Sequence, residues 1–262
     1  MPSPKEPQVA TGHLSTRHVA FVVLAAAIGA YYVSADSLWS ASVTWDVVFL
    51  AAVLIPAIFG LVWLVLPAWS SRFAFFVGVG FAAAAVGLTV ADLDVVANFA
   101  KLGATTFLAF WFLSFFETAS WVALVAVVIP WVDAWSVWRG PTHDIVTNRE
   151  HVFGTLSIAF PVPGEHDAAN LGLPDLVFFA LFLAASARFR LRPRLTWILM
   201  AASFGATIAL AVAFDVEGLP ALPLLSRAFL VANADLLWRD VRRSLRRSDE
   251  QSAPQRPSRS SE

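Results

Sequence analysis

The amino-acid sequence predicts an all-α polytopic membrane protein with about eight transmembrane helices. The chain has 262 residues, of which 58% are hydrophobic and 14% are charged, and its mean hydropathy is +0.68. Those values are typical of a membrane protein rather than a soluble domain of the same length. The chain has no cysteine, so disulfides, thiolate catalysis and cysteine-ligated metals are excluded.

Each predicted helix is an apolar run of about 20 residues, the length needed to cross the hydrocarbon core of a bilayer. The runs cover residues 18–35, 46–67, 73–91, 98–116, 118–138, 171–187, 195–214 and 219–238. Only "FETAS", around Glu117, separates the fourth run from the fifth. Residues 10–17 are polar and no cleavage site closes the first run, which argues against a signal peptide. We therefore expect residues 1–17 to form a cytoplasmic tail and residues 18–116 to form a scaffold of helices.

The loop arginines and lysines predict the orientation, because cytoplasmic loops carry an excess of these residues. With the N-terminus inside, fourteen basic residues lie on the cytoplasmic side and three, Lys101, Arg139 and Arg149, on the other. Both termini are therefore expected in the cytoplasm. The alanine- and arginine-rich composition indicates a prokaryotic cell membrane.

The C-terminal segment, residues 239–262, is polar and contains several prolines and serines. That composition predicts disorder. Its arginine cluster, residues 239–247, is expected to contact anionic lipid headgroups. A specific protein partner for the cluster is the alternative.

Two acidic residues fall inside the predicted spans, where a carboxylate costs several kcal/mol unless it is paired, protonated or hydrated. Asp133 lies about six residues, roughly 9 Å, from the end of the fifth span. Asp175 lies about five residues, roughly 7–8 Å, from the start of the sixth. The two spans are antiparallel and share one loop, so the two carboxylates lie at similar depth. The other acidic residues near the spans are interpreted as solvated caps at span ends: Asp36, Asp46, Asp92, Asp94, Asp215 and Glu217.

Two adjacent carboxylates suit general acid–base chemistry. They share a proton, so one can activate a water molecule while the other protonates a carbonyl oxygen. Such a pair hydrolyses a peptide bond without a metal or a nucleophilic side chain. In the alternative interpretation, each aspartate joins neighbouring helices by hydrogen bonding.

Prolines loosen the backbone around this depth. "LGLPD", residues 171–175, places Gly172, Leu173 and Pro174 directly before Asp175, although a proline is also common in the first turn of a helix. "PALP", Pro220 to Pro223, begins the eighth span with two prolines. Backbone groups left without helical partners there are available to an extended peptide.

These three motifs, with Asp133 in "PWVDAWSVWRGP", resemble the presenilin and signal peptide peptidase family of intramembrane aspartyl proteases over residues 117–238. In that family an aspartate in one span works with the aspartate of a Gly-x-Gly-Asp motif in the next, and a Pro-Ala-Leu motif supports the site. The resemblance implies a presenilin-like bundle with Asp133 and Asp175 as the catalytic pair. Supporting residues would be Gly172, Leu173, Pro174, Pro220, Ala221, Leu222 and Pro223.

The sequence departs from the family at two points. Pro174 stands where the family has its second glycine, and eight spans are predicted where the family usually has nine. With a cytoplasmic C-terminus, the arrangement is more similar to signal peptide peptidase than to presenilin. The resemblance then implies a site open toward the exterior.

The loop at residues 140–170 separates the two aspartate-bearing spans. Its β-branched and aromatic stretch, residues 152–162, predicts a strand or short hairpin, which in the family pairs with an unwound substrate. A plain surface loop is the alternative. The histidines of this loop match no metal-ligand spacing, so no metal is expected.

Arg227, in the eighth span, is expected to pair with a carboxylate inside the bundle. The predicted function is hydrolysis of transmembrane segments, with single-span proteins or peptides as substrates, the lipid bilayer as surroundings, and neither a cofactor nor a nucleic acid. A proton-coupled transporter and an inactive pseudoprotease that binds transmembrane helices are the alternatives. Haem or quinone chemistry is disfavoured because His18 is the sole histidine near a span.

Overall fold

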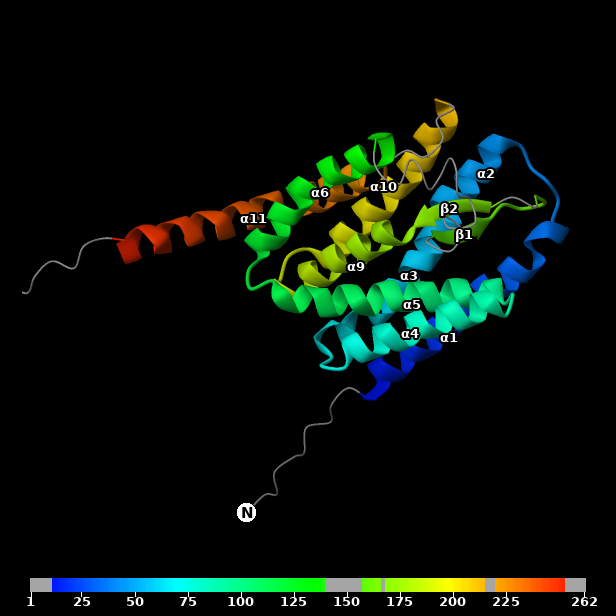
Figure 1. Ribbon diagram of the computed structural model, residues 1–262, viewed down its shortest axis with the longest axis horizontal. Coiled ribbons are helices and arrows are strands. Elements are labelled where there is room, and N and C mark those ends of the chain that lie inside the picture. The colour runs from blue at the N-terminus through cyan, green and yellow to red at the C-terminus, as the bar shows by residue number, and fades with distance from the viewer. Residues whose placement is uncertain (1–10, 140–156, 166–167, 215–219, 253–262) are drawn as a thin grey trace, which may run out of the picture.

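The computed structural model describes residues 11–139, 157–165, 168–214 and 220–252. These residues form a bundle of helices and one two-stranded sheet (Figure 1). The N-terminal half consists of α1 (Thr11–Ser34), a rod built from α2 (Val43–Phe49) and α3 (Ile55–Val65), then α4 (Ala74–Val90) and α5 (Asp94–Phe112). The C-terminal half consists of α6 (Ala119–Arg139), β1 (Ser157–Pro161), β2 (Ala168–Gly172), α9 (Leu173–Arg188), α10 (Pro193–Ala213) and α11 (Leu222–Ser252).

The eight helical rods in this part of the chain match the eight predicted spans in order and position. The break between the fourth and fifth rods falls at residues 116–118, inside the sequence "FETAS". A widened π turn, Leu50–Leu54, joins α2 to α3 just before Pro56. Proline has no N–H for the helical hydrogen bond at that point, which explains the local widening.

The prediction of an all-α polytopic membrane protein is confirmed. Within the described residues, five helices are long and apolar enough to cross a membrane, and they correspond to α1, the α2–α3 rod, α5, α6 and α10. Helix α4 is a shorter apolar helix. Helix α9 has 16 residues, and α11 carries charged residues along its length.

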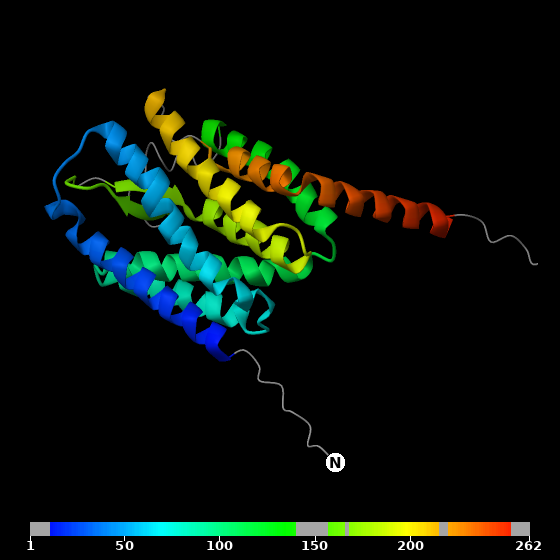
Figure 2. The ribbon, with the colours of Figure 1, turned by 180° about the vertical axis from the view of Figure 1, so that it is seen from behind.

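Helix α9 forms the centre of the bundle. It packs against α5, α10 and α11, and every side chain at positions 179–186 is buried. The ring of Phe179 stacks on Phe59 of α3 with centroids 3.8 Å apart, and that of Phe182 stacks on Phe229 of α11 at 4.7 Å. A helix that is apolar on all sides is stable only in such a position. From behind, the α2–α3 rod and α10 lie side by side (Figure 2).

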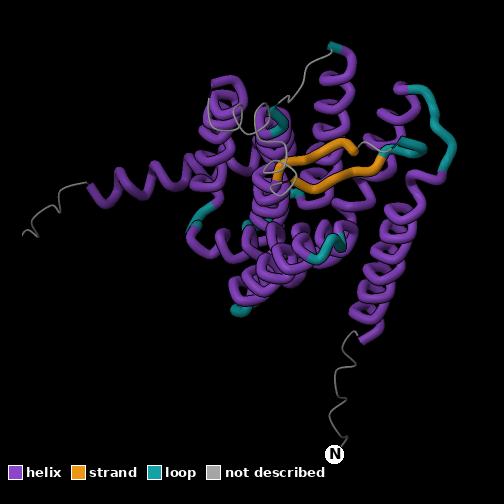
Figure 3. The backbone as a smooth tube through the Cα atoms, turned by 45° about the vertical axis from the view of Figure 1, so that its right-hand side comes forward, coloured by secondary structure: helices purple, strands orange, loops and turns teal. Residues whose placement is uncertain are grey.

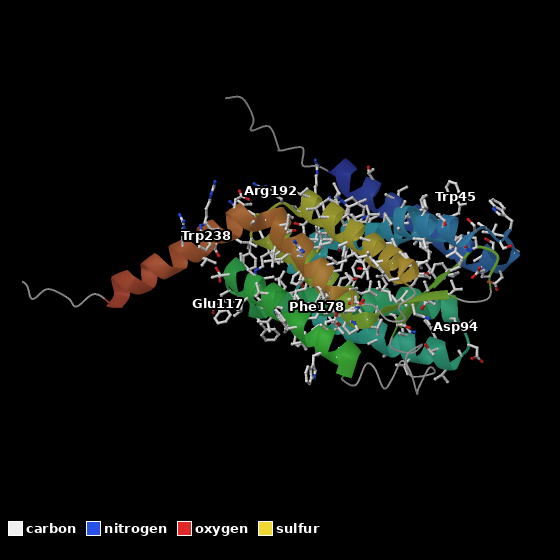
Figure 4. The ribbon with its side chains drawn as sticks, turned by 90° about the horizontal axis from the view of Figure 1, so that it is seen from above. Trp45, Asp94, Glu117, Phe178, Arg192 and Trp238 are labelled. Carbon is white, nitrogen blue, oxygen red and sulfur yellow. The ribbon has the colours of Figure 1, made fainter. Side chains whose placement is uncertain are left out.

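Charged residues and tryptophans lie at both ends of the bundle. In Figure 4, Glu117, Arg192 and Trp238 lie at one end and Trp45 and Asp94 at the other. At the first end, Arg192 forms a bidentate pair with Asp235 of α11, with N–O distances of 2.7 and 2.8 Å. These contacts fix α11 against the corner between α9 and α10.

The prediction of disorder for residues 239–262 is wrong for the part that the structure describes. Helix α11 continues without a break to Ser252 and projects beyond the bundle (Figure 1). The physical reason is that arginine, leucine and glutamate are good helix formers, and no proline occurs between Pro223 and Pro254. Residues 253–262 lie outside the described part, as do residues 1–10 of the predicted N-terminal tail.

Candidate active site

Asp175 lies in the first turn of α9, where strand β2 runs directly into the helix. Gly172 is both the last residue of β2 and the N-cap of α9, with φ −62° and ψ 141°. The backbone N–H of Gly172 donates a hydrogen bond to the carboxylate of Asp175, an arrangement similar to half of a capping box. A Cβ atom on Gly172 would lie 3.3 Å from Asp175 Oδ2. Glycine therefore lets the strand end close to the carboxylate.

Pro174 fits this geometry without loss of a helical hydrogen bond. It is the second residue of α9, and the first four N–H groups of a helix have no intrahelical acceptor. Proline in the first turn therefore removes a donor that the helix does not use. Pro174 is thus compatible with an intact start of α9.

Asp133 lies in α6 and contacts the start of α11. The backbone N–H of Leu222 donates a hydrogen bond of 3.2 Å to Asp133 Oδ2. Leu222 is the first residue of α11, and the carbonyl of Ala221 accepts the first helical bond, from Leu225 N–H at 3.1 Å. The carboxylate of Asp133 therefore binds one of the N–H groups that the helix itself leaves unpaired.

The segment Pro220 to Pro223 is packed at this point. Ala221 and Leu222 are buried, while Pro220 and Pro223 are partly buried. Pro223 is the second residue of α11, so its missing N–H again costs no helical hydrogen bond. The two prolines thus lie on either side of the segment whose Leu222 N–H group binds Asp133.

The structure brings the two aspartates together. Helix α6 packs against both α9 and α11, and the carboxylates of Asp133 and Asp175 interact electrostatically. Both side chains are partly buried. Two carboxylates, each bound to a backbone N–H group at a helix N-terminus, therefore lie near the point where α6, α9 and α11 converge, close enough to interact electrostatically. Helix dipoles favour negative charge at such positions.

The sheet lies beside this site. Strands β1 and β2 are antiparallel, with Ser157 opposite Gly172 and Pro161 opposite Ala168. Figure 3 shows the pair lying across the bundle, away from the N-terminal end of α1. The strand expected in the 140–170 loop is therefore present, and its partner strand leads into the helix that carries Asp175. Residues 152–156 of the expected strand lie outside the described residues.

Arg227 does not lie inside the bundle, contrary to expectation. Its side chain is exposed on the outer face of α11, and among the described residues no carboxylate lies within salt-bridge distance of it. The reason is helical phase: Leu225, Ser226 and Phe229 point inward, which turns position 227 outward. Neither aspartate of the site therefore has Arg227 as a counter-ion.

Metal binding has no support in the described residues, where no cluster of three or more histidine, aspartate or glutamate side chains lies together. The loop histidines His143, His151 and His166 lie outside that part of the chain.

Sequence reasoning missed three side chains that hold the sheet: Tyr31, Tyr32 and Lys101. The positive-inside count interpreted Lys101 only as a charge on the exterior side. Its place within an apolar run was the available signal, since a cation there requires a partner.

Comparison of the chain with protein-family models and with curated proteins finds no match. The sequence motifs and the geometry of the site therefore carry the functional argument.

Proposed function

We propose that this protein is an intramembrane aspartyl protease that hydrolyses peptide bonds of transmembrane segments, with Asp133 and Asp175 as its catalytic pair. The observation that carries the proposal is the convergence of both carboxylates at the junction of α6, α9 and α11. The "PALP" segment supplies the N–H group that binds one of them. These elements correspond to the three motifs of the presenilin and signal peptide peptidase family.

The chemistry follows from a shared proton. Two neighbouring carboxylates repel when both are ionised, so the pair is most stable with one proton between them. The ionised carboxylate removes a proton from a water molecule whose oxygen attacks the peptide carbonyl carbon. The protonated carboxylic acid gives its proton to the carbonyl oxygen. In the second half of the reaction, the carboxylic acid that took its proton from water protonates the amide nitrogen. The other carboxylate accepts a proton from a hydroxyl group of the tetrahedral intermediate as the C–N bond breaks, so the pair again holds one proton.

The backbone hydrogen bonds orient these groups. The Leu222 N–H group occupies Oδ2 of Asp133 and leaves Oδ1 for water or substrate. The Gly172 N–H group holds Asp175 in the first turn of a helix whose following side chain, Leu176, is buried. Both carboxylates are therefore oriented by the main chain, which a substrate does not need to displace.

Strand β2 supports a role in substrate binding. A helical peptide bond is shielded, so a transmembrane substrate must be extended at the cleavage point. An extended peptide can add to a strand edge through main-chain hydrogen bonds. Strand β2 ends three residues before Asp175, so a peptide paired with its outer edge would reach the aspartates.

We further propose that the protein lies in a prokaryotic cell membrane, with both termini in the cytoplasm and the site facing the exterior.

The test is cleavage of single-span substrates by the purified full-length protein in proteoliposomes. Asp133→Asn and Asp175→Asn each keep a hydrogen-bond acceptor of the same shape but remove the ionisable group. Each variant is expected to lose about 10²–10⁴-fold in kcat. Asp92→Asn is the matched control, because Asp92 is exposed with φ 56°, a conformation that asparagine tolerates. Full cleavage by either site variant would exclude the two-aspartate mechanism.

A second candidate is a catalytically inactive protein that binds transmembrane helices. The capping bonds favour it, because hydrogen bonds to Gly172 and Leu222 give each aspartate a structural role without catalysis. This candidate predicts binding of single-span peptides that persists in the asparagine variants, without cleavage by the wild type. The transporter alternative predicts instead proton-dependent uptake in the same proteoliposomes.

A further inference from the structure

The outer edge of β1 is occupied by side chains from the N-terminal half of the protein. In an antiparallel pair, alternate residues direct their N–H and C=O groups away from the partner strand. The carbonyl of Ser157 accepts a hydrogen bond from Lys101 Nζ at 3.0 Å. The carbonyl of Ala159 accepts one from Tyr32 OH at 2.7 Å, and that of Pro161 one from Tyr31 OH at 2.6 Å. Three successive outward carbonyls therefore each have a side-chain donor.

The three donors come from two helices far away in sequence. Tyr31 and Tyr32 lie in the last turn of α1, which ends at Ser34, and they are the only two tyrosines in the chain. Their hydroxyls reach carbonyls two residues apart along β1, a separation of about 6.6 Å in an extended strand. Neither contact is a local feature of the strand, so both depend on the position of α1.

Lys101 is placed differently from a surface lysine. Its side chain is buried in α5, with 8% of its surface exposed, and Ser157 is buried at 1%. Asp94, two turns earlier in α5, interacts with it electrostatically. A buried ammonium is expensive without strong acceptors, so the strand carbonyl is an important partner of this cation.

A fourth contact joins the turn after β1 to Ala35, the residue that follows α1. The N–H group of Gly164 donates to the carbonyl of Ala35 at 2.9 Å. Gly164 has φ +73°, and a Cβ atom there would lie 2.4 Å from the backbone nitrogen of Ser40. Only glycine allows this approach. The whole length of β1 and its turn is therefore docked on α1 and α5.

We propose that Tyr31, Tyr32 and Lys101 are positioning residues of the active site. They hold β1 and, through its ladder, the strand β2 that leads into Asp175. They also fill the outer edge of β1, so a substrate peptide can pair only with β2. The N-terminal helices thereby determine which strand edge receives the substrate. The effect on cleavage rests on the proposed protease function, whereas the effect on the strands does not.

The first experiment is hydrogen–deuterium exchange of the full-length protein in lipid nanodiscs. The variants are the double change Tyr31→Phe with Tyr32→Phe, which keeps both rings, and Lys101→Met, which keeps the length of the side chain. Each is expected to speed exchange of the β1–β2 amides about tenfold or more. Thr105→Val is the matched control, because its buried hydroxyl donates to carbonyls of its own helix, those of Lys101 and Leu102. Unchanged exchange in both the double tyrosine variant and Lys101→Met would overturn the proposal.

The second experiment separates positioning from general damage by steady-state kinetics. A loosened β2 edge binds substrate less well, so KM for a single-span substrate is expected to rise about fivefold or more, with kcat changed less. Partial unfolding would instead lower kcat by reducing the active fraction and leave KM unchanged, which would contradict the proposal. Gly164→Ala, which separates the turn from α1 but keeps all three donors, is expected to raise KM in the same way. If the wild type cleaves nothing, the protease proposal fails. The exchange experiment still tests whether Tyr31, Tyr32 and Lys101 hold the strands.

Discussion

The hydrogen bond from Leu222 N–H to Asp133 can be removed without a break in α11. Leu222 is the first residue of that helix, a position that accepts proline. The preceding residue, Ala221, is an N-cap, and N-caps usually have the extended conformation that precedes proline. Leu222→Pro therefore removes the donor while the helix can still begin at the same place.

The expected size of the effect follows from the geometry. A hydrogen bond to a charged group contributes about 1.5–3 kcal/mol, and a length of 3.2 Å places this one near the lower limit. About 1.5 kcal/mol of lost orientation corresponds to roughly a tenfold lower kcat/KM. The change also deletes a side chain that is only 3% exposed, which lowers the free energy of unfolding by about 2–5 kcal/mol.

Leu222→Ala provides the control, because it loses most of the same side chain but keeps the N–H group. The assay compares kcat/KM of the two variants on one single-span substrate, with their unfolding temperatures measured in parallel. We expect the proline variant to be about tenfold slower than the alanine variant at similar stability. Equal kcat/KM values would refute the idea that this amide orients Asp133.

Three further predictions concern the helices that support the site. Pro174→Gly should keep activity within a few fold, because an N–H group at this position of the first turn has no helical acceptor, and should lower the free energy of unfolding by about 0.4–1 kcal/mol. A large gain of activity would show that the proline distorts the site. Asn233→Ala should cost about 1–3 kcal/mol in denaturant unfolding, because buried Asn233 donates to Thr196 Oγ1 at 2.8 Å and accepts from Arg192 N–H at 2.9 Å; a neutral effect would contradict this. A double-mutant cycle on Arg192 and Asp235, whose side chains are 45% and 44% exposed, should give only a weak coupling because solvent screens the pair. A strong coupling would contradict this and point to a rigid pair.

The helices were predictable from sequence because each follows from the local hydrophobicity of the chain. An apolar run of membrane-spanning length predicts a helix wherever it lies, and the break at "FETAS" is visible in the polar residues around Glu117. The similar depths of Asp133 and Asp175 followed from the rise per residue and a shared loop. The disorder predicted for residues 239–252 is wrong for a local reason as well: arginine, leucine and glutamate favour a helix even in a segment of polar composition.

The contacts between elements could not be predicted in the same way. No local pattern shows that Tyr31 and Tyr32 reach β1, more than 120 residues later in the chain. The same is true of Lys101, whose acceptor lies 56 residues away, and of Arg227, which faces outward because of the phase of α11 against its neighbours.

The sequence alone determined the class of the protein, the order of its helices and the two carboxylates at one depth, since hydrophobicity and helical rise act residue by residue. Tertiary structure alone decided which backbone N–H group each aspartate receives and that the side chains of Tyr31, Tyr32 and Lys101 occupy the outer edge of β1. These features depend on distances between segments far apart in sequence. Such distances are fixed only when side chains pack and buried polar groups find partners.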